Sequence, residues 1–356
     1  MNTSMLAGRL HLDTLTFAVE EVPVPVPGPG EVLVEVRAAG VCLSDLHLID
    51  GSISPISPVD AVRESGAFTL GHEVAGVVHT LGPDVRGAWV QGQPVVLQAG
   101  QTCGECEDCV VRRRGTCRQP LTRGVDYDGG WAQYTLARED TLVPLPDGLP
   151  FDQAAIIPDA VSTPYAAIVE AGAVRPAQSV GIWGAGGIGA HGIRIARLVG
   201  AAPIIAIDPL PGARERALAF GADLALDPTA PDFAQAVRQA TAGQGLQVAF
   251  DFAGVGAART QATAALSSGG VLVLAGLTPE PHTVADSVNF CFQNQQIRGH
   301  YGSSEDHVEQ LIRLVSAGRL DLAPSITAQV PLAEAADAVA RLEKKIDDPI
   351  RLVLTP

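Results

Sequence analysis

The chain has 356 residues, of which 47% are hydrophobic and 18% are charged, and its formal net charge is −15 at pH 7. This length and hydrophobic share favour a folded protein of two domains over a disordered chain. The negative charge excludes nucleic acid and anionic membranes as natural partners, because both would repel the chain. No apolar run approaches the roughly 18 residues of a membrane span, and the N-terminus lacks the basic start and apolar core of a signal peptide. A cytoplasmic protein is therefore expected.

Residues 1–158 are predicted to form a β-rich domain. Short runs with many β-branched residues end at glycine and read as strands, among them EVLVEVRAAG, EVAGVVHTLG and QPVVLQAG. The proline-rich segment VPVPVPGPG, residues 22–30, predicts an extended connector, because proline cannot donate a hydrogen bond inside a sheet.

Residues 159–300 alternate predicted strands with predicted helices. The strands are read in SVGIW, PIIAID, LALD, LQVAFDFAG and VLVLAGL. Strands that alternate with amphipathic helices form a parallel sheet covered on both faces, so we predict a doubly wound Rossmann domain. Residues 301–356 add two helices and a final strand, and this segment is expected to return to the β-rich domain.

A glycine pattern lies between the first strand and helix of the predicted Rossmann domain. WGAGGIG places Gly184, Gly186 and Gly189 in a G-x-G-x-x-G spacing. The first glycine permits a tight turn, the second lets backbone amides approach a pyrophosphate, and the third lets the helix pack closely. The spacing alone is a weak signal, but its strand–helix context supports a dinucleotide site that includes Gly187 and Ile188 at the helix start.

Asp208 ends the next predicted strand, nineteen residues beyond Gly189. A carboxylate there accepts hydrogen bonds from a ribose 2′-hydroxyl and repels a 2′-phosphate, so the sequence predicts NAD rather than NADP. The alternative is a turn residue before Pro209.

Four of the six cysteines lie in TCGECEDCVVRRRGTC, at positions 103, 106, 109 and 117. The C-x2-C-x2-C-x7-C spacing of Cys103, Cys106, Cys109 and Cys117 predicts a structural zinc site in a lobe at residues 100–118, where the metal supplies folding energy. An iron–sulfur cluster is one alternative, but bacterial ferredoxins space the last cysteine differently. A nucleic-acid-binding knuckle is another, since Arg112–Arg114 are basic, but the overall acidity opposes it.

Two further motifs complete a family pattern. GVCLSDLH contributes Cys42, Ser44 and His47, and LGHEVAG contributes His72 and Glu73. With the cysteine lobe, the glycine pattern and the closing IRLVLTP, these motifs resemble the zinc-containing medium-chain alcohol dehydrogenases over nearly the whole chain. The resemblance implies a GroES-like β-rich catalytic domain joined to a Rossmann NAD-binding domain, in a homodimer or homotetramer.

The resemblance implies that Cys42 and His72 are ligands of a catalytic zinc. Asp159, in AAIIPDAVSTPY, stands where many members carry a third ligand, a cysteine, and some secondary-alcohol members use aspartate. An unpaired carboxylate in such an apolar run would be costly unless it were solvated or met a positive group. One thiolate and one carboxylate neutralise Zn²⁺, with His72 as the neutral ligand. Glu73 is either a supporting group or an alternative ligand.

The resemblance also assigns roles in catalysis and cofactor binding. Zinc acts as a Lewis acid on the alcohol, hydride passes to the nicotinamide, and Ser44 and His47 relay the proton. Arg351 matches a position that contacts the cofactor pyrophosphate, and Thr163 matches one beside the nicotinamide. The alternative for Arg351 is a solvated charge at the end of a strand, and the alternative for His47 is a surface histidine.

We therefore expect an NAD-dependent oxidoreductase with two Zn²⁺ per chain, acting on a secondary alcohol and its ketone. A polyol, threonine-type or aldehyde-oxidising dehydrogenase of the same superfamily remains an alternative. The second alternative belongs to another class: a protein that keeps the fold and binds NAD but catalyses no reaction.

Overall fold

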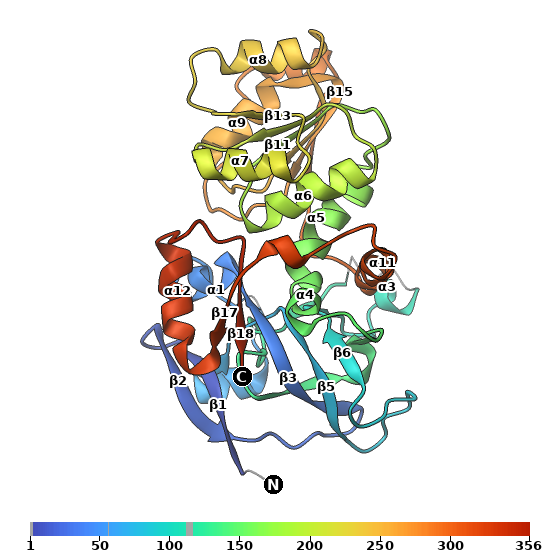
Figure 1. The fold of residues 1–356 in the computed structure, drawn as a ribbon, viewed down its shortest axis with the longest axis vertical. Helices are drawn as coiled ribbons and strands as arrows, with labels where there is room; N and C mark the ends of the chain where they lie inside the picture. Colours follow the sequence, from blue (N-terminus) through green and yellow to red (C-terminus); the bar gives the residue numbers. More distant parts are fainter. Residues whose placement is uncertain (1–2, 56, 112–116) are drawn as a thin grey trace. The chain divides into compact units, whose positions relative to one another are not determined.

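The structure is a computed structural model that describes residues 3–55, 57–111 and 117–356 (Figure 1). The chain divides into two units, Met1–Ser162 with Ser303–Pro356 and Thr163–Gly302. Asp159 thus belongs to the same unit as the N-terminal strands, and the chain passes between the units twice. Within the described ranges no helix is long and apolar enough to cross a membrane.

A seven-stranded sheet forms the centre of the first unit, in the order β10-β6-β5-β3-β18-β17, with β9 also paired to β3. Its strands are β3 (Glu31–Val41), β5 (Val74–Leu81), β6 (Pro94–Leu97), β9 (Tyr134–Arg138), β10 (Leu142–Pro144), β17 (Ile326–Pro331) and β18 (Arg351–Thr355). Alternate residues of β3, including Val32, Val34 and Val36, are buried in the core. β18 pairs antiparallel with β3 through Leu352 and Val41, so the last residues of the chain lie within this sheet.

Smaller elements surround this sheet. A three-stranded sheet contains β1 (Ser4–His11), β2 (Thr16–Pro23) and β4 (Ala67–Thr69), and β7 (Gly100–Gln101) pairs with β8 (Leu121–Thr122). The helices are α1 (Leu43–Ile49), α2 (Asp60–Ser65), α3 (Glu107–Val110), α4 (Phe151–Ala155), α11 (Glu305–Ser316) and α12 (Ala335–Glu343). The proline-rich residues 24–30 lie outside the strands, as their lack of backbone donors requires.

The second unit is a parallel sheet in the order β13-β12-β11-β14-β15-β16. Its strands are β11 (Val180–Trp183), β12 (Ile204–Ile207), β13 (Leu224–Leu226), β14 (Leu246–Asp251), β15 (Leu266–Leu274) and β16 (Gln296–Gly299). The chain runs outward from β11 to β13, returns to the other side of β11, and then runs outward to β16. The order therefore reverses between β11 and β14, which confirms the predicted doubly wound fold.

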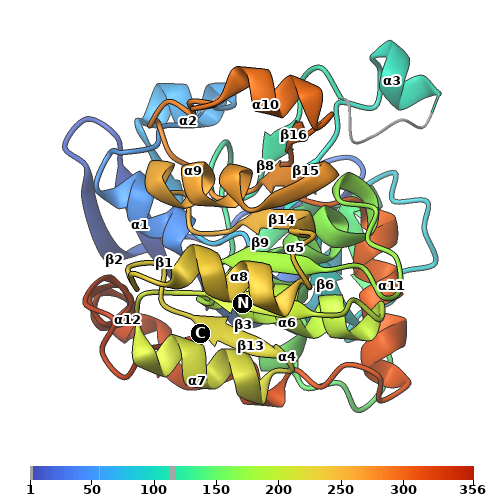
Figure 2. The ribbon, with the colours of Figure 1, turned by 90° about the horizontal axis from the view of Figure 1, so that it is seen from above.

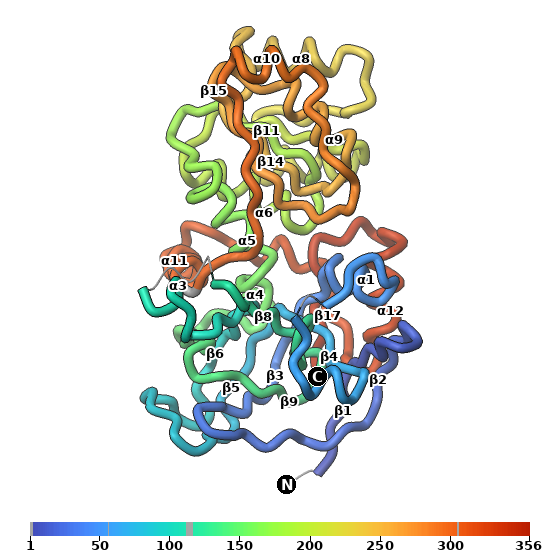
Figure 3. The backbone as a smooth tube through the Cα atoms, turned by 180° about the vertical axis from the view of Figure 1, so that it is seen from behind, coloured from blue at the N-terminus to red at the C-terminus, as the bar shows by residue number. Residues whose placement is uncertain are grey.

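Helices cover this sheet on both faces, and β11 and β12 are accordingly buried throughout. They are α6 (Gly187–Leu198), α7 (Pro211–Ala219), α8 (Phe233–Ala240), α9 (Gly256–Ala264) and α10 (Ser287–Phe292), with α5 (Ser162–Ala166) at the start of the unit. α9 and α7 lie on opposite sides of the strands (Figure 2). Figure 3 follows the segment α9–β15–α10, drawn in orange, from behind.

Candidate active site

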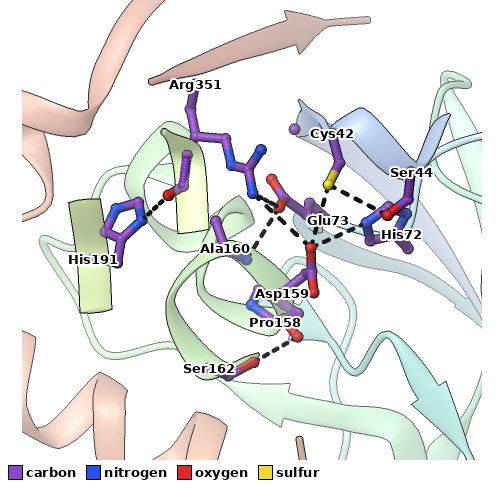
Figure 4. Close-up of polar contacts among 12 residues, drawn as sticks. Cys42, Ser44, His72, Glu73, Pro158, Asp159, Ala160, Ser162, His191 and Arg351 are labelled. Atoms are coloured by element: carbon purple, nitrogen blue, oxygen red, sulfur yellow. Dashed lines mark hydrogen bonds and ion pairs between the residues drawn. The ribbon is translucent and has the colours of Figure 1, made fainter. Parts of the chain in front are cut away.

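Four side chains that could hold a metal ion converge in the first unit (Figure 4). One donor atom from each of Cys42, His72, Glu73 and Asp159 lies within 4.8 Å of the others. Cys42 follows β3 and precedes α1, His72 and Glu73 precede β5, and Asp159 comes from the helical segment after α4. The residues that the sequence analysis assigned to a catalytic zinc are therefore brought together from three separate segments.

Asp159 is carried by a widened helical turn. α4 ends at Ala155, and residues Ile157–Val161 form a π-type turn before α5 begins. Pro158 has no N–H to donate to the preceding turn, and Val161 N instead donates to Ile156 O at 3.3 Å. The turn presents the Asp159 carboxylate to Cys42 and His72, and 17% of its side chain is exposed.

The distances in this cluster match a tetrahedral zinc site. Asp159 Oδ2 lies 3.5 Å from Cys42 Sγ and 3.3 Å from His72 Nε2. Zinc bonds to sulfur at about 2.3 Å and to nitrogen or oxygen at about 2.0–2.1 Å, which at tetrahedral angles separates sulfur from oxygen by about 3.5 Å and nitrogen from oxygen by about 3.3 Å. The residues present therefore fit a zinc ion in both donor chemistry and spacing.

Asp45 supports His72 from the opposite side. Its Oδ2 accepts a hydrogen bond from Cys42 N at 2.8 Å, and its Oδ1 lies 3.6 Å from His72 Nδ1. Metal-ligating histidines usually direct the second ring nitrogen toward a carboxylate, which fixes the tautomer and leaves the other nitrogen for the metal. Sequence reasoning gave Asp45 no role, although Asp45 lies in the GVCLSDLH motif that contains Cys42.

Negative charge is concentrated around His72. Burial opposes its protonation, but the carboxylates of Asp45 and Asp159 outweigh this effect and raise the pKa of His72 well above its usual value. Burial also raises the pKa of Glu73 to about 7, against the opposing influence of Arg351. The cluster therefore attracts a positive charge strongly, and a divalent cation bound there would displace the proton from His72.

Glu73 and Arg351 form a buried ion pair beside the zinc-ligand candidates. Arg351 Nη2 lies 3.1 Å from Glu73 Oε1 and 3.9 Å from Asp159 Oδ2. Ala160 N donates to the same Glu73 oxygen at 3.1 Å. Sequence reasoning placed Arg351 at the cofactor pyrophosphate; within this unit its guanidinium is directed at Glu73 and at the Val41 carbonyl oxygen.

The two proton-relay candidates both lie on α1. Ser44 Oγ is 3.7 Å from Cys42 Sγ. His47 is half-buried and follows three residues later, so the helical period places it on the same side of α1, one turn further along.

The cysteine lobe brings its four thiols within 4.8 Å of one another. Cys103 Sγ lies 3.8 Å from Cys109 Sγ and 3.6 Å from Cys117 Sγ, too far apart for disulfides. Ligands of a tetrahedral zinc at about 2.3 Å are about 3.8 Å apart, so this set also fits zinc. A hydrogen bond from the backbone of Arg118 lowers the pKa of Cys106 to about 6, whereas burial raises the pKa of Cys109 to about 12. Arg112–Arg114 lie outside the described residues.

The glycine pattern lies at the expected strand–helix junction of the second unit. Gly184 follows β11 with a φ of 88°, which favours glycine, and Gly186 is the N-cap of α6. Gly187, Ile188 and Gly189 form the first turn of the helix, whose free N–H groups suit a phosphate.

Asp208 follows β12 and is tied to this loop. Its Oδ2 accepts from Ala185 N and its Oδ1 from Leu210 N, both at 2.9 Å, and the residue is 8% exposed. Thr163, at the start of this unit, is buried, and His300 Nε2 lies 3.1 Å from its carbonyl oxygen.

Comparison with known proteins identifies the family. The model described as alcohol dehydrogenase GroES-like domain matches residues 28–147, and the one described as zinc-binding dehydrogenase matches residues 187–317. The chain belongs to the zinc-containing medium-chain alcohol dehydrogenase family. This alcohol dehydrogenase family member is 33% identical to the L-threonine 3-dehydrogenase of Pyrococcus horikoshii over 314 residues, 86% of each chain.

Two further relatives span the whole chain. The sorbitol dehydrogenase of Bacillus subtilis is 30% identical over 359 residues, covering 99% of this chain and 98% of its own. A solved structure, described as a zinc-binding dehydrogenase from Sinorhizobium meliloti bound to NADP, has a TM-score of 0.89 and 26% identity, with 100% of both chains covered. The predicted family and fold are confirmed, and the protein is an oxidoreductase that transfers hydride between a nicotinamide dinucleotide and an alcohol or its carbonyl.

Replacing Gly40 by alanine should lower the free energy of unfolding by about 1–3 kcal/mol, because overpacking a core costs about that much. A Cβ at Gly40 would overlap Glu73 Oε2 and displace the carboxylate from Arg351. Thermal unfolding of the variant measures the effect. Gly100→Ala is the matched control, since nothing lies within 4 Å of a Cβ at that position. A Gly40→Ala protein as stable as the wild type would contradict the close packing of Glu73 on β3.

Proposed function

We propose that the protein is a zinc- and NAD-dependent dehydrogenase of secondary alcohols that also reduces the corresponding ketones. The observation that carries this proposal is the spacing of Cys42, His72 and Asp159, which suits zinc with one position left for substrate. The aspartate ligand resembles that of secondary-alcohol members of the family. The hydroxyl at position 3 of threonine, which the Pyrococcus relative is named for, is likewise a secondary alcohol.

Cys42, His72 and Asp159 would hold the catalytic zinc, with Glu73 beside them. Bound there, zinc supplies Lewis acidity toward the alcohol or carbonyl oxygen, while NAD accepts or donates the hydride. Asp45 fixes the ring of His72, and Arg351 balances the buried charge of Glu73.

Ser44 and His47 would move the proton. The Ser44 hydroxyl lies beside the Cys42 sulfur, where it can accept the proton that an alcohol loses. The imidazole of His47 is partly exposed, so it can exchange that proton with water. By resemblance, the cofactor ribose connects the two.

The second unit would hold NAD through the glycine pattern and Asp208. Gly184, Gly186 and the first turn of α6 offer backbone N–H groups to the pyrophosphate. The Asp208 carboxylate is fixed by two backbone amides and keeps lone pairs for ribose hydroxyls. By resemblance, Arg351 and Thr163 would contact the pyrophosphate and nicotinamide.

The cysteine lobe would hold a second, structural zinc, which gives two zinc ions per chain. Its thiols and Cys42 can serve as ligands only when reduced, which supports a cytoplasmic location. The proposed homodimer or homotetramer is supported by exposed apolar side chains on α10, Val288 at 79% and Phe292 at 81%. This helix precedes β16, a strand at the edge of the sheet that can pair with another chain.

Zinc content should distinguish the two metal sites. The wild-type protein is expected to carry about two zinc ions per chain, and Asp159→Ala about one, because two ligands hold zinc less well than three. Elemental analysis of gel-filtered protein measures this. Asp147→Ala, at an exposed loop position, is the control and should keep both ions. An Asp159→Ala protein with an unchanged zinc content would exclude Asp159 as a ligand.

A turnover panel tests the substrate class. With NAD, kcat/KM should be at least about tenfold higher for 2-butanol than for 1-butanol, a difference that a shaped pocket can supply. The panel should include L-threonine and sorbitol, because relatives at 33% and 30% identity are named for these substrates. A clear preference for L-threonine would indicate a threonine-type dehydrogenase, and a clear preference for sorbitol would indicate a polyol dehydrogenase. Efficient oxidation of aldehydes would indicate an aldehyde-oxidising enzyme.

Asp208 should set the cofactor preference. The wild-type kcat/KM is expected to be at least about tenfold higher with NAD than with NADP, and Asp208→Asn should lower that ratio, because the variant no longer repels the 2′-phosphate. Steady-state kinetics with both cofactors measures the ratio in each protein. Equal efficiency of the wild type with NADP, the cofactor bound in the Sinorhizobium structure, would defeat the assignment.

A further inference from the structure

A buried ion pair joins β14 to α9 in the second unit. Arg259 Nε donates to Asp251 Oδ2 at 2.7 Å, and the two side chains are 8% and 0% exposed. Burying a charged pair contributes little stability compared with well-packed apolar residues, because both groups lose their hydration. Stability alone therefore does not account for the pair, and its other contacts show what it holds.

Asp251 accepts hydrogen bonds from backbone N–H groups of two loops. Its Oδ1 accepts from Ala253 N at 3.0 Å and from Gly254 N at 2.8 Å, in the loop after β14. Its carbonyl oxygen accepts from Ala275 N at 3.1 Å and from Gly276 N at 2.7 Å, in the loop after β15. One residue thus fixes the start of both loops.

Arg259 binds the second loop from the side of α9. Its Nη2 donates to Gly276 O at 2.7 Å, while its Nε remains on Asp251. Two flanking contacts run along the same helix face, from Gly256 N to Glu280 Oε2 at 2.7 Å and between Thr263 Oγ1 and His282 Nε2 at 3.4 Å. Positions 256, 259 and 263 share one side of a helix. The loop from 276 to 282 therefore lies along α9, with Arg259 as its buried central attachment.

These loops lie at the carboxyl ends of β14 and β15. In a doubly wound sheet the dinucleotide binds beyond the carboxyl ends of the strands, one mononucleotide to each half. Asp208 follows β12 in the first half and suits the adenosine ribose, so the loops after β14 and β15 belong to the nicotinamide half. A cavity of about 440 Å³ opens there, lined by Arg259, Gly276, Leu277 and Thr278 and, after β16, by His300 and Tyr301.

We propose that Arg259 is a positioning residue that holds the loop after β15 in the shape required by the nicotinamide half of the cofactor. The inference rests on the proposed use of NAD. The guanidinium donates to the Asp251 carboxylate from Nε and to the Gly276 carbonyl from Nη2, and lysine, with one nitrogen, cannot place a donor at both positions. Arg259→Lys therefore keeps the buried charge pair and releases the loop.

Binding of NADH and of ADP-ribose, which lacks the nicotinamide, tests the proposal. NADH is titrated by its fluorescence and ADP-ribose by calorimetry, with the wild type, Arg259→Lys and a control, Arg197→Lys. Arg197 is an exposed arginine paired with Asp223 in the same unit. Arg259→Lys should weaken NADH binding about tenfold and change ADP-ribose binding by less than about twofold, whereas Arg197→Lys should change neither.

Equal weakening of both ligands, or no change in either, would overturn the proposal. Should Arg259→Lys fail to fold, the double variant Asp251→Asn, Arg259→Met removes both buried charges together with the bond to Gly276, and the same selective loss is expected. A wild-type protein that binds neither NADH nor ADP-ribose would instead refute the proposed function, so the two failures are distinguishable.

Discussion

The concentration of buried negative charge around His72 is the constraint on which the first unit depends. Asp45, Glu73 and Asp159 present carboxylates, and Cys42 a potential thiolate, in a region where Arg351 is the fixed cation. Burying several anions together costs several kcal/mol, roughly, so the arrangement favours uptake of positive charge, either as a proton on His72 or as a bound cation. A divalent cation held there would supply that charge and Lewis acidity toward an alcohol oxygen.

That constraint explains local features with no other evident purpose. Gly40 lacks a side chain where Glu73 approaches β3. The helix after α4 widens at Pro158 so that Asp159 faces the cluster. Arg351 begins β18, which inserts beside β3, so the last strand of the chain supplies the cation at the site. The pairing of β18 with β3 therefore completes the sheet of the first unit and also brings Arg351 to Glu73.

The sequence allowed prediction of features that depend on local spacing. The glycine pattern and the cysteine lobe each lie within about fifteen residues, and the alternating strands and helices predicted the Rossmann sheet. The partnership of Asp45 with His72, and of Asp251 with Arg259, was not predictable in the same way. A motif contains Asp45, but neither that motif nor the periodicity around Asp251 indicates which side chain each aspartate meets in the folded chain. Asp159 was assigned as a ligand by resemblance. Its orientation follows from a widened helical turn, and Pro158 is the one residue in the sequence that indicates such a turn.

The two units use buried arginine in the same way. Arg351 joins the Glu73 carboxylate to the Val41 carbonyl oxygen, and Arg259 joins the Asp251 carboxylate to the Gly276 carbonyl oxygen. In each case two different nitrogens of the planar fork contact an acidic side chain and a backbone oxygen, whereas lysine offers one nitrogen. The ion pair of Glu73 with Arg351 thereby holds the start of β18, where substrate is proposed to bind. The ion pair of Asp251 with Arg259 holds the loop after β15, where the cofactor is proposed to bind.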